Sequence, residues 1–218
     1  APVHDVRRLG ELLRREDVGG FDVEIAEDLN STDLRKCILR FFNAASPADQ
    51  TIVYFSGHGD KNDAGQLYFN TEDTEPDLLE ASAVSARFLI ERAQKSLSKQ
   101  TVFLIDCCNS GAFASSLGVR SGTQTLSQDD FAVEGSHGMA VITASAGLQP
   151  ARERSVEGGA ESLFNRHLID AIATGAADVA QTGKITLAGL FHYIRDQLRQ
   201  EGATQQPRSF FFGLSGEE

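Results

Sequence analysis

The chain has 218 residues, 41% of them hydrophobic and 23% charged, a composition typical of globular proteins that excludes disordered, fibrous and membrane classes. Its formal charge of -11 argues against a nucleic-acid partner, because a phosphate-binding surface needs clustered lysine and arginine, and favours a basic ligand. No apolar run reaches the roughly 18 residues of a membrane span, and "APVHDVRRLG" lacks a signal-peptide core, so we expect a cytoplasmic protein. The three cysteines, Cys37, Cys107 and Cys108, fit neither a disulfide framework nor a usual zinc spacing.

The first elements in chain order are two helical patterns with an extended segment between them. "DVRRLGELLRRE" carries apolar residues at helical spacing, and "FDVEIAED" then alternates them with acids, which is typical of a strand. "STDLRKCILRFF" opens with the cap candidates Ser31 and Thr32 and carries a second apolar stripe. The stripe includes Cys37, so we predict that this thiol lies in the core.

Strand and helix patterns alternate through the rest of the chain. The strand patterns are "TIVYF", a short "QLYFN", "TVFLID" and "MAVITAS". The helix patterns are "VSARFLIERAQKSL", "SLFNRHLIDAIA" and "LAGLFHYIRDQL", and His192 falls off the apolar stripe of the last one, so we expect it to be solvated. This alternation predicts an α/β domain with a largely parallel sheet and helices on both faces.

Two of the predicted strands end in turns that carry reactive side chains. "TIVYF" is followed by Ser56, Gly57, His58 and Gly59, and "TVFLID" is followed by "CCNSG". The two glycines could simply form a tight turn that leaves His58 on the surface. Ligands of such sheets bind beyond the carboxyl ends of the strands, so neighbouring strands would place the imidazole opposite a thiol. That pair suits nucleophilic cysteine catalysis, in which imidazole helps to form the thiolate and then protonates the leaving amine.

The spacing of the two turns makes the pattern more specific. His58 and Cys108 are 50 positions apart, close to the separation found in caspases. "YFSGHG" resembles the histidine motif, and "DCCNSG" the D-x-C-x-S-G cysteine motif, of caspase-like cysteine peptidases of metacaspase and paracaspase type. The resemblance extends over nearly the whole chain, to bacterial members that work beside or fused to other effector domains. It implies one domain, a three-layer caspase-like sandwich with a large-subunit-like region (residues 1–113), a polar linker (residues 114–138) and a small-subunit-like region (residues 139–218).

The sequence departs from the family pattern at two points. The family's first strand is expected upstream of residue 1. The chain is therefore interpreted as a fragment, as a processed form, or as one whose upstream piece is disordered or supplied separately. An activating effector protein is a further expected partner. Asn109 stands where metacaspases usually carry histidine, which changes the local hydrogen bonding but not the nucleophile.

The resemblance implies a role for each residue of the two turns. Cys108 is the nucleophile and His58 the general base and acid, acting as a dyad because no third orienting carboxylate is evident. Cys107 points the other way from an extended backbone and is expected in the core. The backbone N–H groups of Gly59 and Cys108 are the implied oxyanion donors.

The resemblance also implies an acidic S1 pocket, which receives the substrate side chain before the cleaved bond. The matching positions are Asp5 and Asp106, with Ser56 and Ser145 as neutral hydrogen-bonding groups. The alternative is that Asp5 caps the first helix and Asp106 merely ends a strand. Two carboxylates suit the planar fork of arginine better than lysine. We therefore predict cleavage of proteins or peptides after Arg, then Lys, and none after Asp.

Processing and calcium are two further expectations. Arg120 is the only lysine or arginine between Cys108 and Arg152, and we predict self-cleavage after it within the exposed polar linker. Metacaspases often need calcium, but acidic loops are more often solvated, so the sequence predicts no metal or other cofactor and keeps calcium as an alternative. The acids that could bind calcium are Asp60, Asp63, Glu72, Asp73 and Asp77.

The predicted role is therefore that of an activated effector protease in a bacterial signalling or defence pathway. The alternative is a catalytically silent caspase-like interaction module, which has no need of an intact cysteine, histidine and oxyanion glycine. A different serine or cysteine hydrolase is disfavoured, because the chain has no G-x-S-x-G motif.

Overall fold

A four-stranded sheet lies at the centre of the molecule. The computed structural model describes residues 2–113, 138–144, 153–156 and 159–212. The strand order is β1-β5-β6-β9. The strands β1 (Gln50–Gly57), β5 (Gln100–Cys107) and β6 (Gly138–Thr143) are parallel, and β9 (Arg208–Phe212) runs antiparallel to β6. The prediction of a largely parallel central sheet is confirmed.

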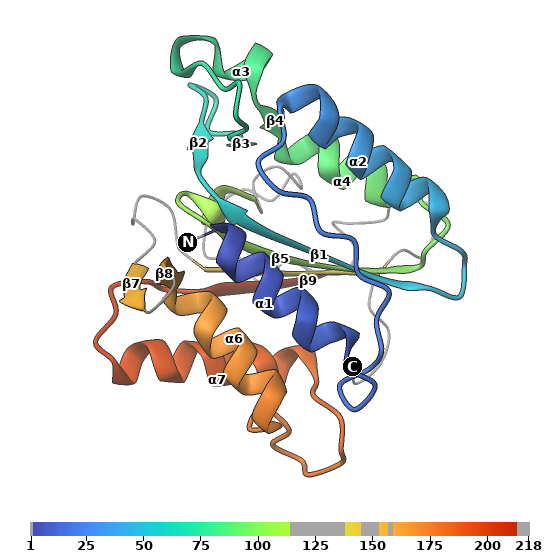
Figure 1. Ribbon diagram of the computed structural model, residues 1–218, viewed down its shortest axis with the longest axis vertical. Coiled ribbons are helices and arrows are strands. Elements are labelled where there is room, and N and C mark those ends of the chain that lie inside the picture. The colour runs from blue at the N-terminus through green and yellow to red at the C-terminus, as the bar shows by residue number, and fades with distance from the viewer. Residues whose placement is uncertain (1, 114–137, 145–152, 157–158, 213–218) are drawn as a thin grey trace.

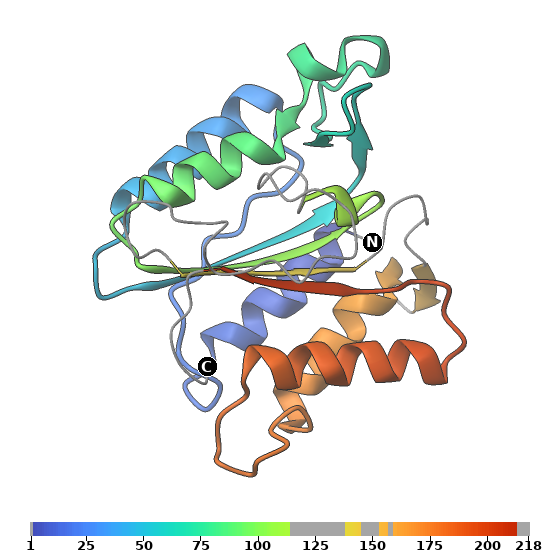
Figure 2. The same cartoon turned by 180° about the vertical axis from the view of Figure 1, so that it is seen from behind.

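Helices cover both faces of this sheet and complete a three-layer sandwich (Figures 1 and 2). On one face lie α2 (Ser31–Ala44) and α4 (Ala86–Gln94), and on the other lie α1 (Pro2–Arg14), α6 (Leu163–Thr174) and α7 (Leu187–Gln200). The predicted α/β architecture is thus confirmed. None of the helices in the described ranges combines the length and the apolar character that crossing a membrane requires.

Each face of the sheet has its own apolar core, because successive side chains of a strand point to opposite faces. The core facing α2 and α4 includes Phe69, Phe103 and Cys107. The core facing α1, α6 and α7 includes Leu104 and Phe164, with Tyr54 packed against it. The same alternation sends neighbouring side chains of β5 to different cores. Cys107 belongs to the core facing α2 and α4, whereas Leu104 belongs to the other.

Smaller elements surround the carboxyl end of β1. The strands β2 (Gly59–Lys61), β3 (Leu67–Phe69) and β4 (Val84–Ser85) form a second antiparallel sheet, and β7 (Glu153–Val156) pairs with β8 (Gly159–Ser162). The 3-10 turn Pro76–Leu78 and the helix α3 (Leu79–Ser82) connect β3 to β4, and a second 3-10 turn, Ser110–Ala112, follows β5. Because β2 starts two residues after β1 ends, the small sheet stands directly beside His58.

The strand predicted from "FDVEIAED" is wrong, because residues 21–27 form no regular element. The segment runs along α1 instead. The backbone N–H of Phe21 donates to the carbonyl of Leu13 at 2.9 Å, and the Arg14 guanidinium donates to the carbonyl of Val23 at 2.7 Å. A Cβ added at Gly10 would lie 2.9 Å from Cδ1 of Ile25. The alternating apolar side chains therefore pack against a helix rather than stabilising a strand pair.

The prediction that Cys37 lies in the core is also wrong. Its thiol is half-buried and donates to Oε1 of Glu24 at 3.6 Å, and burial followed by the charge of Glu24 raises the pKa of Cys37. In the same helix, Phe42 is buried in the core, with Ile38 packed against it. The prediction for His192 is confirmed, since this side chain is exposed on α7.

Candidate active site

The pairing of β1 with β5 brings the histidine turn and the cysteine turn to one edge of the sheet. The two strands are parallel neighbours, and Gly57 lies opposite Cys107 in their register. Parallel strands end at the same edge, so the next residues of each chain segment, His58 and Cys108, emerge side by side. His58 is exposed and Cys108 is half-buried.

Direct packing holds the two turns together. A Cβ added at Gly59 would lie 2.8 Å from Sγ of Cys107 and 2.9 Å from the carbonyl oxygen of Cys108, so only glycine allows this approach. The side-chain Nδ2 of Asn109 donates to the carbonyl of Gly59 at 3.0 Å. Asn109 has φ 61° and ψ 10°, the left-handed conformation that asparagine tolerates better than most residues. The amide thus ties the cysteine turn to the histidine turn.

The small sheet leaves one backbone donor of this region outside its ladder. Gly59 lies opposite Phe69, and the N–H of Asn70 donates to the carbonyl of His58 at 3.0 Å. In an antiparallel pair, that bond makes Gly59 and Phe69 a non-hydrogen-bonded pair. The ladder between β2 and β3 therefore does not use the N–H of Gly59.

The two adjacent thiols have different environments. Cys107 is fully buried, and burial followed by the charge of Asp106 raises the pKa of this thiol well above its ordinary value. A thiol that stays protonated is a poor nucleophile. Cys108 has left the strand and is half-buried, so it is the thiol of this pair with access to the surface.

Three of the four predicted S1 residues come together at the carboxyl ends of β1 and β5. The Ser56 hydroxyl donates to Oδ2 of Asp5 at 3.4 Å, and Ser56 lies opposite Asp106 in the strand register. Asp5 and Asp106 are 0% and 3% exposed, so both carboxylates are buried beneath this edge. The fourth residue, Ser145, and the predicted processing residue, Arg120, lie outside the described residues.

Asp5 is held by groups from the far end of the chain. Its Oδ2 accepts from the N–H of Ser162 at 3.3 Å, and its Oδ1 accepts from Nδ2 of Asn165 at 3.2 Å. Burial raises the pKa of Asp5, and these two hydrogen bonds oppose the rise. In the described ranges of the chain, no lysine or arginine forms an ion pair with this carboxylate. Ser162 belongs to β8 and Asn165 to α6. A residue that served only to cap α1 would not need hydrogen bonds from these two elements.

Sequence reasoning missed several residues of this region. Tyr54 donates from its hydroxyl to Oδ2 of Asp106 at 3.3 Å, and burial followed by the charge of Asp106 raises the pKa of this phenol well above its ordinary value. Its position two residues before Ser56 in a strand puts both on one face, which is a readable signal. Ser162 and Asn165 carry no comparable signal, since they lie 157 and 160 positions from Asp5.

The acids considered for calcium do not gather into a site. Asp73 accepts from the N–H of Ser31 at 2.7 Å, and Asp60 accepts from Nδ2 of Asn70 at 2.7 Å. Among the described residues, the one group of three potential metal ligands contains none of the five acids.

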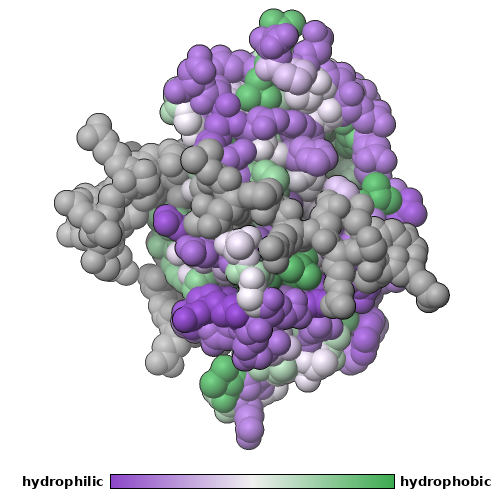
Figure 3. Space-filling model, turned by 90° about the vertical axis from the view of Figure 1, so that its left-hand side faces the viewer, coloured by the Kyte–Doolittle hydropathy of each residue, from purple (hydrophilic) through white to green (hydrophobic). Residues whose placement is uncertain are grey.

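The face at the carboxyl ends of the strands is mostly hydrophilic where the structure describes it (Figure 3).

Comparisons with known proteins agree with this geometry. The family model Peptidase_C14, described as a caspase domain, matches residues 1–213. The crystal structure of protein GSU0716 from Geobacter sulfurreducens is similar, with a TM-score of 0.64 and 14% identity over 97% of this chain and 84% of that one. Caspase-1 from Spodoptera frugiperda is similar with a TM-score of 0.61 and 16% identity, over 94% and 76% of the respective chains. No curated protein sequence matches significantly.

Proposed function

Since the chain belongs to the caspase-domain family, whose members are cysteine peptidases, we propose that it is a cytoplasmic endopeptidase that cleaves after arginine and, less well, lysine. The observation that carries the proposal is the contact between the two turns. Gly59 packs against the carbonyl of Cys108. His58, which precedes Gly59, and the thiol of Cys108 therefore lie at the same edge of the sheet.

The proposed reaction follows from the groups at this edge. His58 takes the proton of the Cys108 thiol, and the thiolate attacks the scissile carbonyl carbon. The N–H groups of Gly59 and Cys108 donate to the oxyanion that forms. His58 then protonates the leaving amine, which departs and leaves an acyl-enzyme. A water molecule, deprotonated by His58, attacks the acyl-enzyme and releases the carboxylic acid and the thiol.

A substitution pair at the adjacent cysteines tests the reaction. We expect Cys108→Ala to abolish cleavage of fluorogenic peptides, and Cys107→Ala to retain most of it with a lower melting temperature, because only Cys107 is a core residue. Retained turnover in the Cys108 variant, together with a dead Cys107 variant, would reverse the assignment. If wild type under activating conditions cleaves nothing, the silent interaction module becomes the better description.

The proposed specificity rests on the buried Asp5 and Asp106 and on the half-buried Ser56, whose hydroxyl donates to Asp5. One pair of opposite charges at about 4 Å contributes roughly 4 kcal/mol at an intermediate dielectric, before desolvation. Half of that, about 2 kcal/mol, favours arginine over an uncharged residue by more than tenfold. Lysine offers one compact charge and binds the two carboxylates less well.

A library of peptides varied at the residue before the cleaved bond measures this preference. We expect the wild type to prefer Arg over Lys and to leave Asp uncleaved. Asp106→Asn keeps the size of the side chain and an oxygen for Tyr54, yet should reduce kcat/KM for Arg substrates by about tenfold or more. Efficient cleavage after Asp or after large apolar residues contradicts the proposal.

The outer edge of β1 is the proposed place for a partner. Within the described residues no strand pairs with that edge, although β1 has eight residues and an apolar centre, IVYF. An exposed strand edge is a template for another strand. We propose that an upstream fragment or an activating effector protein of a bacterial signalling or defence pathway adds a strand there.

A further inference from the structure

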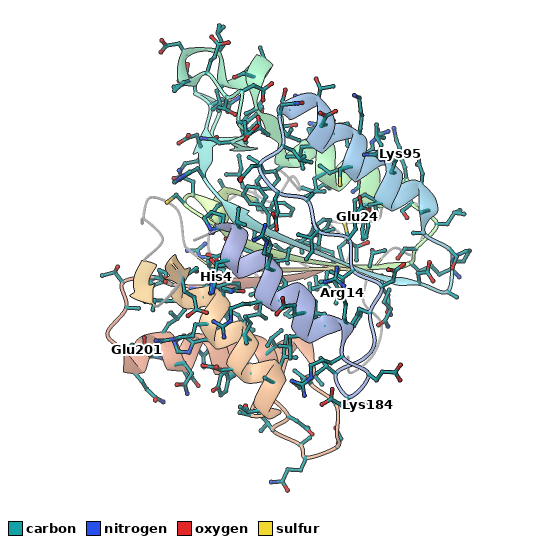
Figure 4. All side chains as sticks on the ribbon, viewed as in Figure 1. His4, Arg14, Glu24, Lys95, Lys184 and Glu201 are labelled. Carbon is teal, nitrogen blue, oxygen red and sulfur yellow. The ribbon has the colours of Figure 1, made fainter. Side chains whose placement is uncertain are left out.

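Three potential metal ligands meet where the start of α1 contacts β8. They are His4 and Asp5 of α1 and Glu161 of β8, and one ligand atom from each lies within 4.8 Å of the other two. Among the described residues this is the only such group. Figure 4 shows His4 at the amino end of α1, and Figure 1 shows β8 next to that end. The fold brings these residues together from opposite ends of the chain.

The imidazole of His4 has a buried nitrogen that receives no hydrogen bond from the described residues. Its Nδ1 is inaccessible to solvent and has no hydrogen-bond partner among them. The nearest carboxylate oxygen, Oδ1 of Asp5, is 3.9 Å away, which is beyond hydrogen-bonding distance. A buried polar atom without a partner costs about 1–3 kcal/mol. The atom facing the two carboxylates is thus one that a bound cation would satisfy.

The charges of the group are also incompletely balanced. Asp5 and Glu161 are 0% and 4% exposed, and the Arg8 guanidinium pairs with Glu161. Among the described residues, the hydrogen-bond donors to Asp5 are neutral groups, and the imidazole of His4 lies beside this carboxylate. Within the described part of the chain, the one guanidinium beside these two buried carboxylates pairs with Glu161, so the Asp5 carboxylate is the group that a bound cation would neutralise.

We infer that His4, Asp5 and Glu161 form a binding site for Zn²⁺ that is separate from the catalytic dyad. Imidazole nitrogen and carboxylate oxygen are both ligand types that zinc takes in proteins, whereas calcium takes six to eight oxygens. Zinc binds these donors at about 2.0–2.2 Å, so the three ligand atoms must close in slightly around the ion. The fourth position of a tetrahedral site is left for water or an exogenous ligand.

Zinc at this position has a consequence for peptide cleavage. Asp5 also accepts a hydrogen bond from Ser56, the residue proposed to line the S1 pocket. A bound ion and the side chain of an arginine substrate would compete for the same carboxylate. Zinc is therefore expected to raise KM for Arg substrates. This consequence rests on the proposed function, whereas the proposed zinc site itself is independent of it.

Zinc binding by a catalytically inactive protein tests the site. The variant Cys108→Ala/His58→Ala removes the imidazole and the thiol of the proposed dyad, which could also bind zinc. Calorimetric titration of this variant with ZnCl₂ gives stoichiometry and affinity. We expect one equivalent of zinc. In that background, His4→Ala and Glu161→Gln should weaken binding by at least about tenfold, no less than loss of an outer-shell partner does. Glu161→Gln retains an oxygen for Arg8, so it removes a charge without removing that contact.

The matched control is His192→Ala, which removes an exposed imidazole from α7 far along the chain. Cobalt substitution adds a spectroscopic control, because cysteine ligands would give a thiolate charge-transfer band. Absence of stoichiometric zinc binding, a thiolate band, or equal affinity in the His4 and His192 variants overturns the inference. Circular dichroism identifies a variant that fails to fold, in which case the other variant decides. An inactive wild type would overturn the peptidase proposal and leave this result unaffected.

Discussion

Asn109 shows how one side chain can position two reactive turns. Its left-handed backbone lets the chain leave β5 sharply, and its amide reaches Gly59 in the histidine turn. Relatives with histidine at this position would need a different contact. The departure from the family pattern at this position is therefore compensated locally, since asparagine supplies both the conformation and the hydrogen bond.

Substitution of Asn109 separates these two contributions. Asn109→Gly keeps the left-handed conformation and loses only the hydrogen bond, worth about 1 kcal/mol, so we expect kcat/KM to fall about fivefold. Asn109→Ala adds a conformational cost of about 1–2 kcal/mol and should lower the melting temperature further. Peptide kinetics and thermal unfolding of both variants measure this. A glycine variant with full activity means that the amide does not position the turns.

Among the helices, α6 and α7 are linked by a titratable contact. His167 on α6 is buried, and its Nε2 lies 3.6 Å from Oε1 of Glu201, which also pairs with Arg166. Burial, followed by the charge of Arg166, lowers the pKa of His167, while Glu201 and Asp170 oppose that shift. The unfolded chain therefore binds a proton at this residue more readily than the folded protein does.

The pH dependence of stability follows from that difference. Above the ordinary histidine pKa of about 6.5, His167 is neutral in both states and contributes its full stability. As the pH falls from that value through the lowered pKa in the folded protein, the stability is lost. We expect His167→Gln to flatten the acid-induced fall of the melting temperature over this range. An unchanged pH profile would mean that other groups cause the acid sensitivity.

At the scale of the whole molecule, the sequence predicts the sheet better than the contacts between its distant segments. The apolar runs of β1 and β5 and the reactive turns after them are local signals, and both were interpreted correctly as strands. Residues 21–27 have the alternation of a strand, but the α1 surface competes for their apolar side chains and backbone groups. Cys37 sits at the edge of its helical stripe and faces Glu24, which periodicity alone does not reveal.

The candidate site divides in the same way. His58, Gly59 and Cys108 are proposed as site residues from short motifs, because each motif is confined to one turn. Asp5 enters only through a family resemblance, and its partners Ser162 and Asn165 have no local pattern that connects them with it. Contacts between residues 157 or more positions apart require the fold itself.

Processing is a prediction about the chain as a whole. We expect the active protein to cut itself after Arg120, and Cys108→Ala to stay intact, because the cut depends on the same thiol as substrate cleavage. Intact mass spectrometry after incubation under activating conditions measures this. Arg120→Ala should prevent the cut and leave the fold unchanged. Identical intact masses for active and Cys108→Ala protein exclude the idea.

The bonds that hold Asp5 determine what such a cut would alter. His58, Gly59, Cys108 and Asn109 all precede the linker, so a break within it leaves the reacting groups on a single fragment. Asp5 is on that fragment too, but Ser162 and Asn165, which fix the position of its carboxylate, belong to the other. Substrate recognition would then depend on both fragments, whereas the reacting groups would all belong to the first. The cut would change substrate specificity, and catalytic activity would not require it.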